Sequence, residues 1–532
     1  MKAEADGRFL PPGIRVRLRA RFSLGGKTTG DRRPYEGQDE MTDEAVSFRD
    51  RGSRVLFGVA AGAVAVVAAG LRLYRLDHFS LWLDEIMQSL FIHGSWGQFW
   101  SSIRFDAMHP PLDYLIDRFF TFLRPGDAAL KLPAVAYGVG AVVALMALIG
   151  RRAGAKAGLA ASVLLAAAPF HVRYSQELRP YSLGVLLVLA SLIALDAFLA
   201  KPSVARLAGL YLAVVATAYT LYVAALVLLV AGAGMTIEDA FSRDLERRRH
   251  ARRFLSFGPL FLVAVAVAYI PWLPVVFAAA RAASPTPAPT LTLARFGNVL
   301  SFYAFAPNAG HALDLAGFLY AGVAAAGLGV ALSRPRLRFL AVWAVAGSAV
   351  IEILEQTKPH FFVPRHYLAS AVAIPALAGL ALASLARVNL LRVGIATFLL
   401  ALFLAADARG LASYFADGRP DWRPLARYLR ERPAGDIVLT ENAYALLCVG
   451  YYVDGPDFLH LTPEERARAR PVLSLQGDPA PIGWLGKPGR TLWLVLSRSG
   501  EPSPVLRRFA APYPSLEFPT AEGGATLKRV GR

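Results

Sequence analysis

The sequence predicts a mainly α-helical protein that crosses a membrane many times, and three observations support this fold class. Hydrophobic residues make up 55% of the 532 residues and charged residues only 18%, whereas soluble proteins have about 25% charged residues. Mean hydropathy is +0.42. The apolar residues also gather in runs of roughly 20, the length that a helix needs to cross the hydrocarbon core of a bilayer.

The formal net charge of +18 does not indicate a nucleic-acid partner. Arg and Lys flank the apolar runs, where the positive-inside rule places them on the cytoplasmic side of a membrane. Cys448 is the one cysteine of the chain. A single cysteine excludes an intramolecular disulfide and a multi-cysteine metal site, so we expect Cys448 to fill space in a core.

Residues 1–50 are polar and have no sustained apolar periodicity, so we expect a disordered cytoplasmic tail. The apolar runs that follow predict about eleven transmembrane helices in a domain of residues 51–407. The expected spans lie at about 54–71, 127–150, 157–170, a segment that ends at Ala200, two within 207–237, then 255–278, 314–333, 339–355, 367–386 and 393–407.

Residues 207–237 are long enough for one span, but the flanking charges indicate two. The segment 201–206 and the arginine-rich segment 243–253 both carry the basic residues of a cytoplasmic flank. Two flanks on one side of the membrane require an even number of crossings. We therefore predict a break near residues 217–220.

The odd number of spans places the C-terminal region on the side opposite to the cytoplasmic N-terminus. The same count places residues 72–126, 171–181, 281–313 and 356–366 outside. The first of these segments, the first outer loop, mixes aromatic with charged residues, which predicts helices lying in the membrane interface. The unusual polar residues of the chain thus converge on one side.

Residues 408–532 predict a small extracytoplasmic α/β domain. Its expected elements are an amphipathic helix at 421–432, short strands at 437–440 and 491–496, a helix at 503–509, and a turn at Gly523-Gly524 between two late strands.

Asp84 and Glu85 form the first candidate site, in the stretch Leu81-Trp82-Leu83-Asp84-Glu85 directly after the first span. A charge at the mouth of an apolar bundle is costly and usually functional. A pair of solvated interfacial charges is the alternative. Adjacent residues of a helix point about 100° apart, so one carboxylate can act as a base while the other binds a cation, a hydroxyl or an arginine.

Two further outer segments carry polar clusters. The segment His109-Pro110-Pro111-Leu112 has a histidine before a rigid Pro-Pro step, and a plain turn into an interfacial helix is the alternative. The segment from Tyr174 to Tyr181 carries Glu177 and Arg179, which we expect either to pair or to contact the substrate. Arg179 suits phosphate recognition, because a guanidinium group presents a bidentate fork.

A fourth outer segment contains Lys358, Arg365, His366 and Tyr367. The positive-inside rule disfavours such a cluster of cations outside the cytoplasm. A belt of snorkelling side chains at the interface is the alternative. A phosphate leaving group would need cations of this kind.

Several motifs are missing from the sequence. It has no glycine-rich P-loop, no Asp-x-Asp motif for a metal-bound nucleotide sugar, and no Cys/His spacing for zinc. A site that faces outward also has no access to cytoplasmic nucleotides. The donor is then expected within the membrane, in the form of a lipid phosphate.

Five segments occur together in the order of a known family. They are Ser80-Leu81-Trp82-Leu83-Asp84-Glu85, His109-Pro110-Pro111-Leu112, Tyr174-Ser175-Gln176-Glu177-Leu178-Arg179-Pro180-Tyr181, Pro364-Arg365-His366-Tyr367-Leu368 and Asp421-Trp422-Arg423. In this combination they resemble the bacterial glycosyltransferases related to dolichyl-phosphate-mannose–protein mannosyltransferases and to the lipid A aminoarabinose transferase. The resemblance covers roughly residues 55–450.

The resemblance implies a GT-C fold, a polyprenyl-phosphate-linked sugar donor and inversion at the anomeric carbon. It implies that Asp84 is the general base, with Glu85 beside it, and that Arg179 and Arg365 bind the lipid phosphate. Some relatives bind a divalent metal cation near the acidic site. Asp84, Glu85 and His109 are the candidate metal ligands here, and no other cofactor is expected.

We therefore expect a glycosyltransferase of the bacterial cytoplasmic (inner) membrane, with its site and its C-terminal domain facing the periplasm. The candidate substrate-binding residues are His109, Tyr174, Glu177, Arg179, Tyr181, Lys358, Arg365, His366 and Tyr367. The sequence leaves open whether a hexose or a pentose is transferred, and whether the acceptor is a lipid, a glycan or a protein. A lipid or sugar transporter or flippase, which would place charges inside its spans, and a non-catalytic glycan-binding membrane protein are the alternatives.

Overall fold

The computed structural model describes residues 51–122, 126–282, 315–357, 364–416, 421–433, 436–456, 458, 472–474, 491–497, 511, 514–518 and 525–530. The expected tail, most of the outer segment 281–313, Lys358, the helix at 503–509 and the turn at Gly523-Gly524 lie outside these residues.

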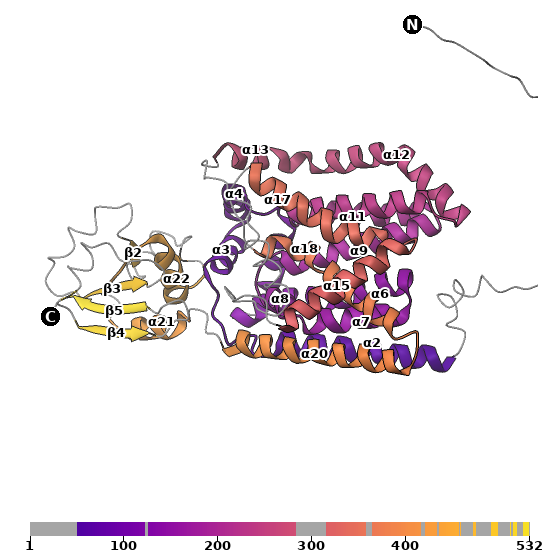
Figure 1. Ribbon diagram of the computed structural model, residues 1–532. Coiled ribbons are helices and arrows are strands. Elements are labelled where there is room, and N and C mark those ends of the chain that lie inside the picture. Colours follow the sequence, from indigo (N-terminus) through magenta and orange to yellow (C-terminus); the bar gives the residue numbers. More distant parts are fainter. Residues whose placement is uncertain are drawn as a thin grey trace, which may run out of the picture. The chain divides into compact units, whose positions relative to one another are not determined.

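Long apolar helices that run roughly parallel or antiparallel to one another form the main part of the molecule (Figure 1). Together with the short helical turns between them, the helices of this part are α2 (Arg51–Leu73), α6 (Asp127–Ala153), α7 (Ala155–Ala167), α8 (Pro169–Tyr174), α9 (Tyr181–Ala200), α10 (Val204–Ala218), α11 (Tyr222–Ala240), α12 (Leu245–Tyr269), η1 (Ile270–Trp272), α13 (Leu273–Ala282), α15 (Leu315–Ser333), α16 (Arg338–Ala341), η2 (Val342–Ala346), α17 (Gly347–Thr357), η3 (Pro364–Tyr367), α18 (Leu368–Ala371), α19 (Ala373–Leu385) and α20 (Leu390–Ala416).

Eight helical segments in the described part of the chain are long and apolar enough to cross a membrane. They are Val55–Leu73, Asp127–Ala153, Tyr181–Ala200, Tyr222–Ala240, Leu245–Ala279, Leu315–Ser333, Arg365–Leu385 and Leu390–Ala416. Two shorter apolar helices, Ala155–Ala167 and Val204–Ala218, accompany them. The predicted class, a polytopic helical protein with a small C-terminal sheet, is confirmed, and the count of eleven spans stays a prediction.

The predicted break in the apolar run 207–237 is confirmed. Helix α10 ends at Ala218 and α11 begins at Tyr222. The side chain of Thr217 donates back to the carbonyl oxygen of Ala213 at 2.8 Å, and Leu221 takes an extended backbone conformation. The carbonyl oxygen of Tyr219 then accepts from the backbone N–H of Leu112 at 2.9 Å, which joins the break to the first outer loop.

Small residues allow the bundle helices to approach closely. A Cβ atom added at Gly327 of α15 would collide with the carbonyl oxygen of Leu377 on α19. One added at Gly379 of α19 would collide with the backbone nitrogen of Ala161 on α7. Because apolar surface gives little driving force between helices in a lipid environment, such close backbone packing is the main source of attraction.

A buried ionic network joins the ends of α6, α9, α11 and α12. Arg152 contacts Asp196 at 3.0 Å and Asp239 at 2.7 Å, and Arg247 contacts the same two carboxylates at 3.0 and 2.8 Å. The side chains of Arg152 and Asp239 are both 0% exposed. Each carboxylate thus bridges two arginines that belong to different helices.

The first outer loop folds into the short helices that its composition predicts. They are α3 (Leu83–Ile92), α4 (Trp96–Asp106) and α5 (Leu112–Phe120). Ser95 caps α4 by accepting from the backbone N–H of Gln98 at 3.3 Å. Ala107 ends α4 in the left-handed conformation with φ +51°, and the chain then turns through His109 into α5.

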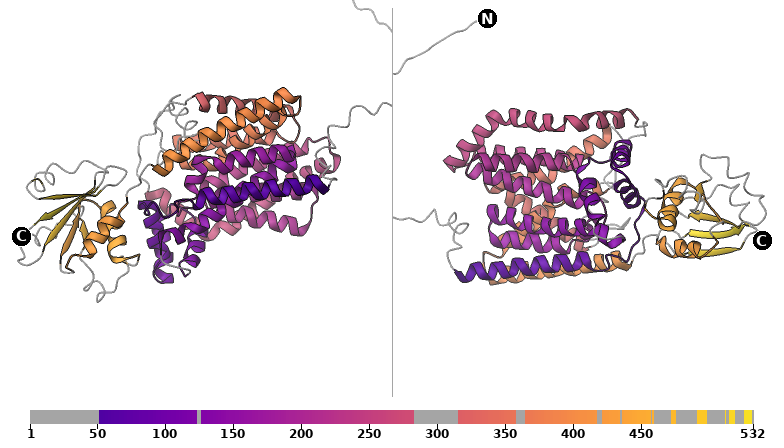
Figure 2. Two further views of the ribbon diagram at one scale, coloured as in Figure 1. Left: turned by 90° about the horizontal axis from the view of Figure 1, so that it is seen from below. Right: turned by 180° about the vertical axis from the view of Figure 1, so that it is seen from behind.

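The C-terminal region contains a five-stranded sheet with α21 (Arg423–Arg430) and α22 (Ala443–Asp454) beside it (Figure 2). The strands are β1 (Ile437–Thr440), β2 (Val472–Ser474), β3 (Leu492–Ser497), β4 (Ser515–Phe518) and β5 (Ala525–Val530), in the order β2-β1-β3-β5-β4. Strand β1 is parallel to β2 and β3, whereas β5 is antiparallel to β3 and β4. The expected helix within 421–432 and the strands at 437–440 and 491–496 are confirmed.

Helix α22 and strand β2 escaped prediction, and α20 continues past the expected boundary at residue 408 to Ala416. Helix α22 matters for the site because it contacts α3. The Tyr452 hydroxyl accepts from the backbone N–H of Leu81 at 2.7 Å and donates to Asp127 at 2.6 Å. Cys448 of α22 is fully buried in the core that α3 and the sheet share, as expected for a space-filling side chain.

Candidate active site

Glu85 lies in the first turn of α3, where its carboxylate holds two separate parts of the chain together. One oxygen accepts from the backbone N–H of Trp82 at 3.1 Å and the other from that of Leu178 at 2.8 Å. The side chain is fully buried. A carboxylate at a helix N-terminus is favoured by the helix dipole. Glu85 thus fixes the segment before α9 against the start of α3.

Asp84 has different surroundings from its neighbour. Its side chain is 25% exposed, and its Oδ2 lies 3.2 Å from Nη2 of Arg365. The two carboxylates therefore point to different partners, as the angle between adjacent helical residues predicts. Of the two carboxylates, only that of Asp84 is open to solvent.

Arg365 comes from η3, far along the chain from Asp84, and lies among aromatic rings. The guanidinium carbon is 5.3 Å from the ring centre of Trp82 and 5.9 Å from that of Tyr181. Such cation–π contacts stabilise a cation in a partly desolvated place. Its Nε is buried and has no hydrogen-bond partner among the described residues.

Arg179 and His109 form the second basic group of the site. One terminal nitrogen of Arg179 donates to the carbonyl oxygen of Asp84 at 3.1 Å, and the other donates to Nε2 of His109 at 2.6 Å. A guanidinium group only donates, so Nε2 of His109 is the acceptor and its proton sits on Nδ1. Nδ1 of His109 and Nε of Arg179 are both buried without a partner in the described part of the chain.

His109 is held in its neutral form. Burial lowers its pKa well below the usual value, and the charges of Arg179, His366 and Arg365 lower it further. The neutral ring can accept from Arg179 and still present an N–H group at Nδ1. The effect of His366 on His109 also shows that η3 brings both of its basic residues to this site.

Tyr174 and Tyr181 form an aromatic wall. Their ring centres are 5.4 Å apart in an edge-to-face arrangement, and the ring of Tyr181 meets that of His109 at 5.9 Å. Both tyrosines are buried. The site therefore has an apolar side next to its cations.

Three other expected substrate-binding residues have partners of their own or lie outside the described residues. Glu177 forms an ion pair with Arg173 at 3.4 Å, and its backbone carbonyl oxygen accepts from the backbone N–H of Arg179 at 2.8 Å. Tyr367 donates to Glu352 at 2.7 Å. Lys358 lies outside the described residues.

The sequence did not reveal a group of three polar side chains, those of Gln88, Asp113 and Asp117, that contacts Arg179. Nε2 of Gln88 donates to Asp113 at 2.7 Å and to Asp117 at 2.6 Å, and Oε1 of Gln88 accepts from Arg179 at 3.4 Å. All three side chains are buried. Asp113 and Asp117 are four residues apart in a stretch rich in apolar and aromatic residues. This spacing could have indicated that both carboxyl groups lie on one side of a helix.

The three candidate metal ligands do not form a metal site. Both oxygens of Glu85 accept from backbone N–H groups, Asp84 pairs with Arg365, and Nε2 of His109 faces Arg179. Within the described residues, no group of three or more His, Cys, Asp or Glu side chains is arranged to hold a metal ion. These residues therefore do not fit a metal cofactor.

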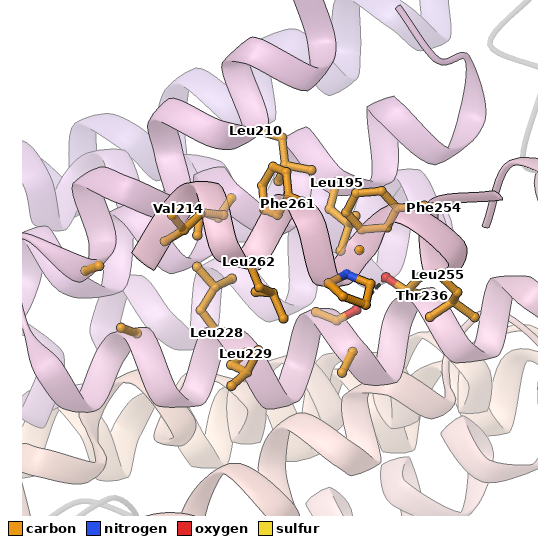
Figure 3. A pocket seen from close by; sticks show the side chains of 18 of the residues that line it. Leu195, Leu210, Val214, Leu228, Leu229, Thr236, Phe254, Leu255, Phe261 and Leu262 are labelled. Atoms are coloured by element: carbon orange, nitrogen blue, oxygen red, sulfur yellow. Dashed lines mark hydrogen bonds between the residues drawn. The ribbon is translucent and has the colours of Figure 1, made fainter. Parts of the chain in front are cut away.

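An apolar cavity of about 500 Å³ lies between α9, α10, α11 and α12. Side chains such as Leu195, Leu210, Leu228 and Phe254 surround a common space (Figure 3). The hydroxyl of Thr236, which also lines it, donates to the carbonyl oxygen of Gly232 at 2.8 Å. The cavity thus suits a hydrocarbon chain and offers little for polar chemistry.

Comparison with known proteins gives a clear result at the level of structure only. No protein-family model and no curated protein matches the chain. ArnT from Cupriavidus metallidurans in the apo state matches with a TM-score of 0.54 and 14% identity, covering 90% of this chain and 98% of ArnT. The same protein bound to undecaprenyl phosphate gives 0.53 and 15%, with the same coverage.

A weaker match is the oligosaccharyltransferase AglB from Archaeoglobus fulgidus in complex with an inhibitory peptide and a dolichol-phosphate. Its TM-score is 0.44 at 11% identity, over 79% of this chain and 65% of AglB, and we draw nothing from it. ArnT is the lipid A aminoarabinose transferase, which is a GT-C glycosyltransferase. The sequence motifs of this chain resemble the family to which that transferase is related. The chain therefore has the GT-C fold that those motifs predicted.

Proposed function

We propose that this protein is an inverting glycosyltransferase that moves a sugar from a polyprenyl-phosphate donor to an acceptor, with Asp84 as the general base. One observation carries the proposal. The accessible carboxylate of Asp84 is flanked by buried N–H groups without partners among the described residues, at Trp82, His109, Arg179 and Arg365. A buried donor left unpaired is costly. A phosphate group supplies the oxygens that such donors lack.

The reaction is a single in-line displacement. A hydroxyl or amine group of the acceptor loses its proton to Asp84 and attacks the anomeric carbon of the sugar. The bond between that carbon and the phosphate oxygen breaks, and polyprenyl phosphate leaves with the bonding electrons. Arg365 and Arg179 stabilise the negative charge that develops on the leaving group.

The ion pair between Asp84 and Arg365 links donor binding to base availability. Nη2 of Arg365 lies 3.2 Å from the carboxylate that acts as the base. A bound phosphate competes for the same guanidinium group, because phosphate is a bidentate partner for arginine. Its arrival releases Asp84 to accept a proton from the acceptor.

The fold and the charge distribution support a lipid-linked donor and a site on the periplasmic side of the membrane. The described bundle matches the fold of ArnT, whose structure has been solved with undecaprenyl phosphate bound, and the apolar cavity suits a hydrocarbon chain. The basic residues near helix ends favour a cytoplasmic N-terminus and a site on the periplasmic side of a bacterial inner membrane. In this arrangement the C-terminal region that follows α20 forms the outer domain, and the acceptor is a lipid, a glycan or a protein.

The decisive variant is Asp84→Asn, assayed with purified protein, radiolabelled polyprenyl-phosphate sugars and membrane extract. General-base catalysis contributes about 10²–10⁴-fold, so we expect a loss of that size with normal expression. Asp77→Asn, which changes an aspartate that is 72% exposed, is the control. Full activity of Asp84→Asn would remove Asp84 from its role. Failure of the unmodified protein to transfer any labelled sugar would refute the function.

A further inference from the structure

Asp113 and Asp117 form a buried carboxyl pair next to the candidate active site. They lie four residues apart on α5, so both side chains project from one side of the helix. The Oδ2 atoms of the two residues accept from the same nitrogen, Nε2 of Gln88, at 2.7 and 2.6 Å. Their exposed fractions are only 2% and 3%. Two full negative charges this close together and away from water would repel each other strongly.

Repulsion of this kind favours a state in which one of the two carboxyl groups holds a proton. Burial raises the pKa of Asp113 to about 6, although the hydrogen bond from Gln88 and the charge of Arg179 oppose this shift. Burial also raises the pKa of Asp117 well above its usual value, and the charge of Asp113 raises it further. The protonation of each carboxyl group thus depends on that of the other, and the pair titrates as a unit.

The carboxyl pair fixes the orientation of the Gln88 amide. An amide nitrogen only donates, so it faces the two carboxyl groups, and the amide oxygen faces the opposite way. Nη1 of Arg179 donates to this oxygen at 3.4 Å. With the amide reversed, its N–H groups would meet the guanidinium group and both carboxyl groups would lose a donor. Because Gln88 contacts both the pair and Arg179, the position of the pair determines where the Gln88 oxygen meets Arg179.

The charge of the pair also balances a buried cation. Arg179 also donates to the carbonyl oxygen of Asp84 and to Nε2 of neutral His109, and its guanidinium group meets the side chain of Tyr181. The titratable groups that surround the pair and Arg179 are Asp84 on α3, Asp106 on α4, Tyr114 on α5, Tyr137 on α6 and Tyr181 on α9. Arg118, next to Asp117 in sequence, donates instead to the carbonyl oxygens of Ile92 and Gly94.

We propose that Asp113 and Asp117 are positioning residues, a proton-sharing pair that holds Gln88 and, through it, orients Arg179 toward the donor phosphate. This inference rests on the proposed function, in which Arg179 binds that phosphate. The essential quantity is the single negative charge of the pair. Either carboxyl group can carry it, and loss of both removes it.

Asparagine variants distinguish this pair from two independent carboxylates. In Asp113→Asn or Asp117→Asn, the remaining carboxyl group has no charged neighbour to repel it and keeps its hydrogen bond from Gln88, so under this proposal it carries the negative charge alone. We expect the donor KM of each single variant to stay within about threefold of the unmodified value, and that of the double variant to rise about tenfold, with kcat less affected. Gln88→Leu should resemble the double variant, because it cuts the link to Arg179.

The donor KM should also depend on pH. As the pH falls below about 6, the pair takes up its second proton and loses its charge, so the donor KM of the unmodified protein should rise. The double variant should lack this rise.

The affinity of the full chain for undecaprenyl phosphate, measured in lipid nanodiscs without any turnover, should follow the same order among the variants. Asp77→Asn serves as the control in each measurement.

Infrared difference spectra of protein labelled at aspartate test the shared proton directly. At neutral pH we expect a carbonyl band from a protonated carboxyl group that disappears in both single variants. The inference would be overturned if this band persisted in the single variants, if the single variants were as impaired as the double variant, or if the double variant kept the unmodified KM. Absence of both sugar transfer and undecaprenyl phosphate binding in the unmodified protein would instead refute the proposed function, and the infrared result would still decide whether the pair shares a proton.

Discussion

At the scale of single residues, two adjacent carboxylates at the start of α3 have opposite surroundings. Glu85 is enclosed by the backbone N–H groups of Trp82 and Leu178, whereas Asp84 faces the partly exposed guanidinium group of Arg365. A buried acceptor with two backbone donors is well suited to hold structure. A reachable carboxylate beside a cation is suited to exchange a proton.

Replacing Glu85 by Gln should therefore destabilise the protein more than it impairs chemistry. Glutamine has one acceptor oxygen, so the N–H of either Trp82 or Leu178 would face an amide NH₂ group. Loss of such a buried hydrogen bond costs about 1–3 kcal/mol. The free energy of unfolding in detergent measures this cost, and the activity of the remaining folded protein should stay well above that of Asp84→Asn. Equal loss of activity at unchanged stability would show Glu85 to be catalytic.

The sequence allowed the separation of the two carboxylates to be predicted, but not their partners. The angle of about 100° between adjacent helical residues follows from helix geometry alone. The N–H of Leu178 lies 93 residues from Glu85 in the chain, and no spacing rule reports such a contact. Gln88 was missed for a similar reason, because one uncharged amide in an apolar helix carries no signal until the fold places Arg179 and Asp113 on either side of it.

At the scale of helices and strands, a buried ionic network links the ends of α6, α9, α11 and α12. Arg152 and Arg247 each contact both Asp196 and Asp239. Buried charges of this kind are costly unless every partner is present. The network therefore favours one arrangement of the four helix ends over others that would separate a charge from its partner.

Arg152→Ala should destabilise the protein by about 3–5 kcal/mol, because it leaves two buried carboxylates without one of their cations. Arg249→Ala is a matched control, since Arg249 pairs with Glu246 at 3.0 Å but both side chains are largely exposed. The control should change stability by at most about 1 kcal/mol. Unfolding of both variants by denaturant in detergent gives the comparison, and equal values for the two would contradict a structural role for the network.

Most of the helices follow from the sequence because apolar runs and basic flanks mark them directly. Even the break between α10 and α11 could be predicted, since charges at both ends required an even number of crossings. Helix α22 could not be predicted in the same way. Its sequence, AYALLCVGYYVD, lacks a polar stripe, because it is buried against α3 as well as against the sheet.

At the scale of the whole described molecule, α3 is braced by the C-terminal region. The Tyr451 hydroxyl lies 3.0 Å from that of Ser89, and the Tyr452 hydroxyl contacts Leu81 and Asp127. The backbone N–H of Trp422 donates to Ser80 at 3.4 Å. The motif that carries Asp84 is thus held from the side of the C-terminal helices as well as by the bundle.

Tyr452→Phe should lower both stability and activity. It leaves the N–H of Leu81 and an oxygen of Asp127 without the hydroxyl group that joins them, at a cost of about 1–3 kcal/mol. Activity should fall because Leu81 begins the stretch that positions Asp84. Tyr74→Phe, at a tyrosine that is 57% exposed, is the control. If transfer rate and unfolding free energy are both unchanged in Tyr452→Phe, the brace has no role in the site.

The attachments of Trp422, Tyr451 and Tyr452 have a mechanical consequence. A rigid body attached at one point can rotate about any axis through that point, and one attached at two points can still rotate about the line that joins them. Each further attachment restricts this rotation. Three hydrogen bonds, to Ser80, Leu81 and Ser89, thus restrain the sheet and its two helices against α3 and the segment that leads into it. A motion that admits a bulky acceptor must then carry this whole assembly along or break at least one of the three hydrogen bonds.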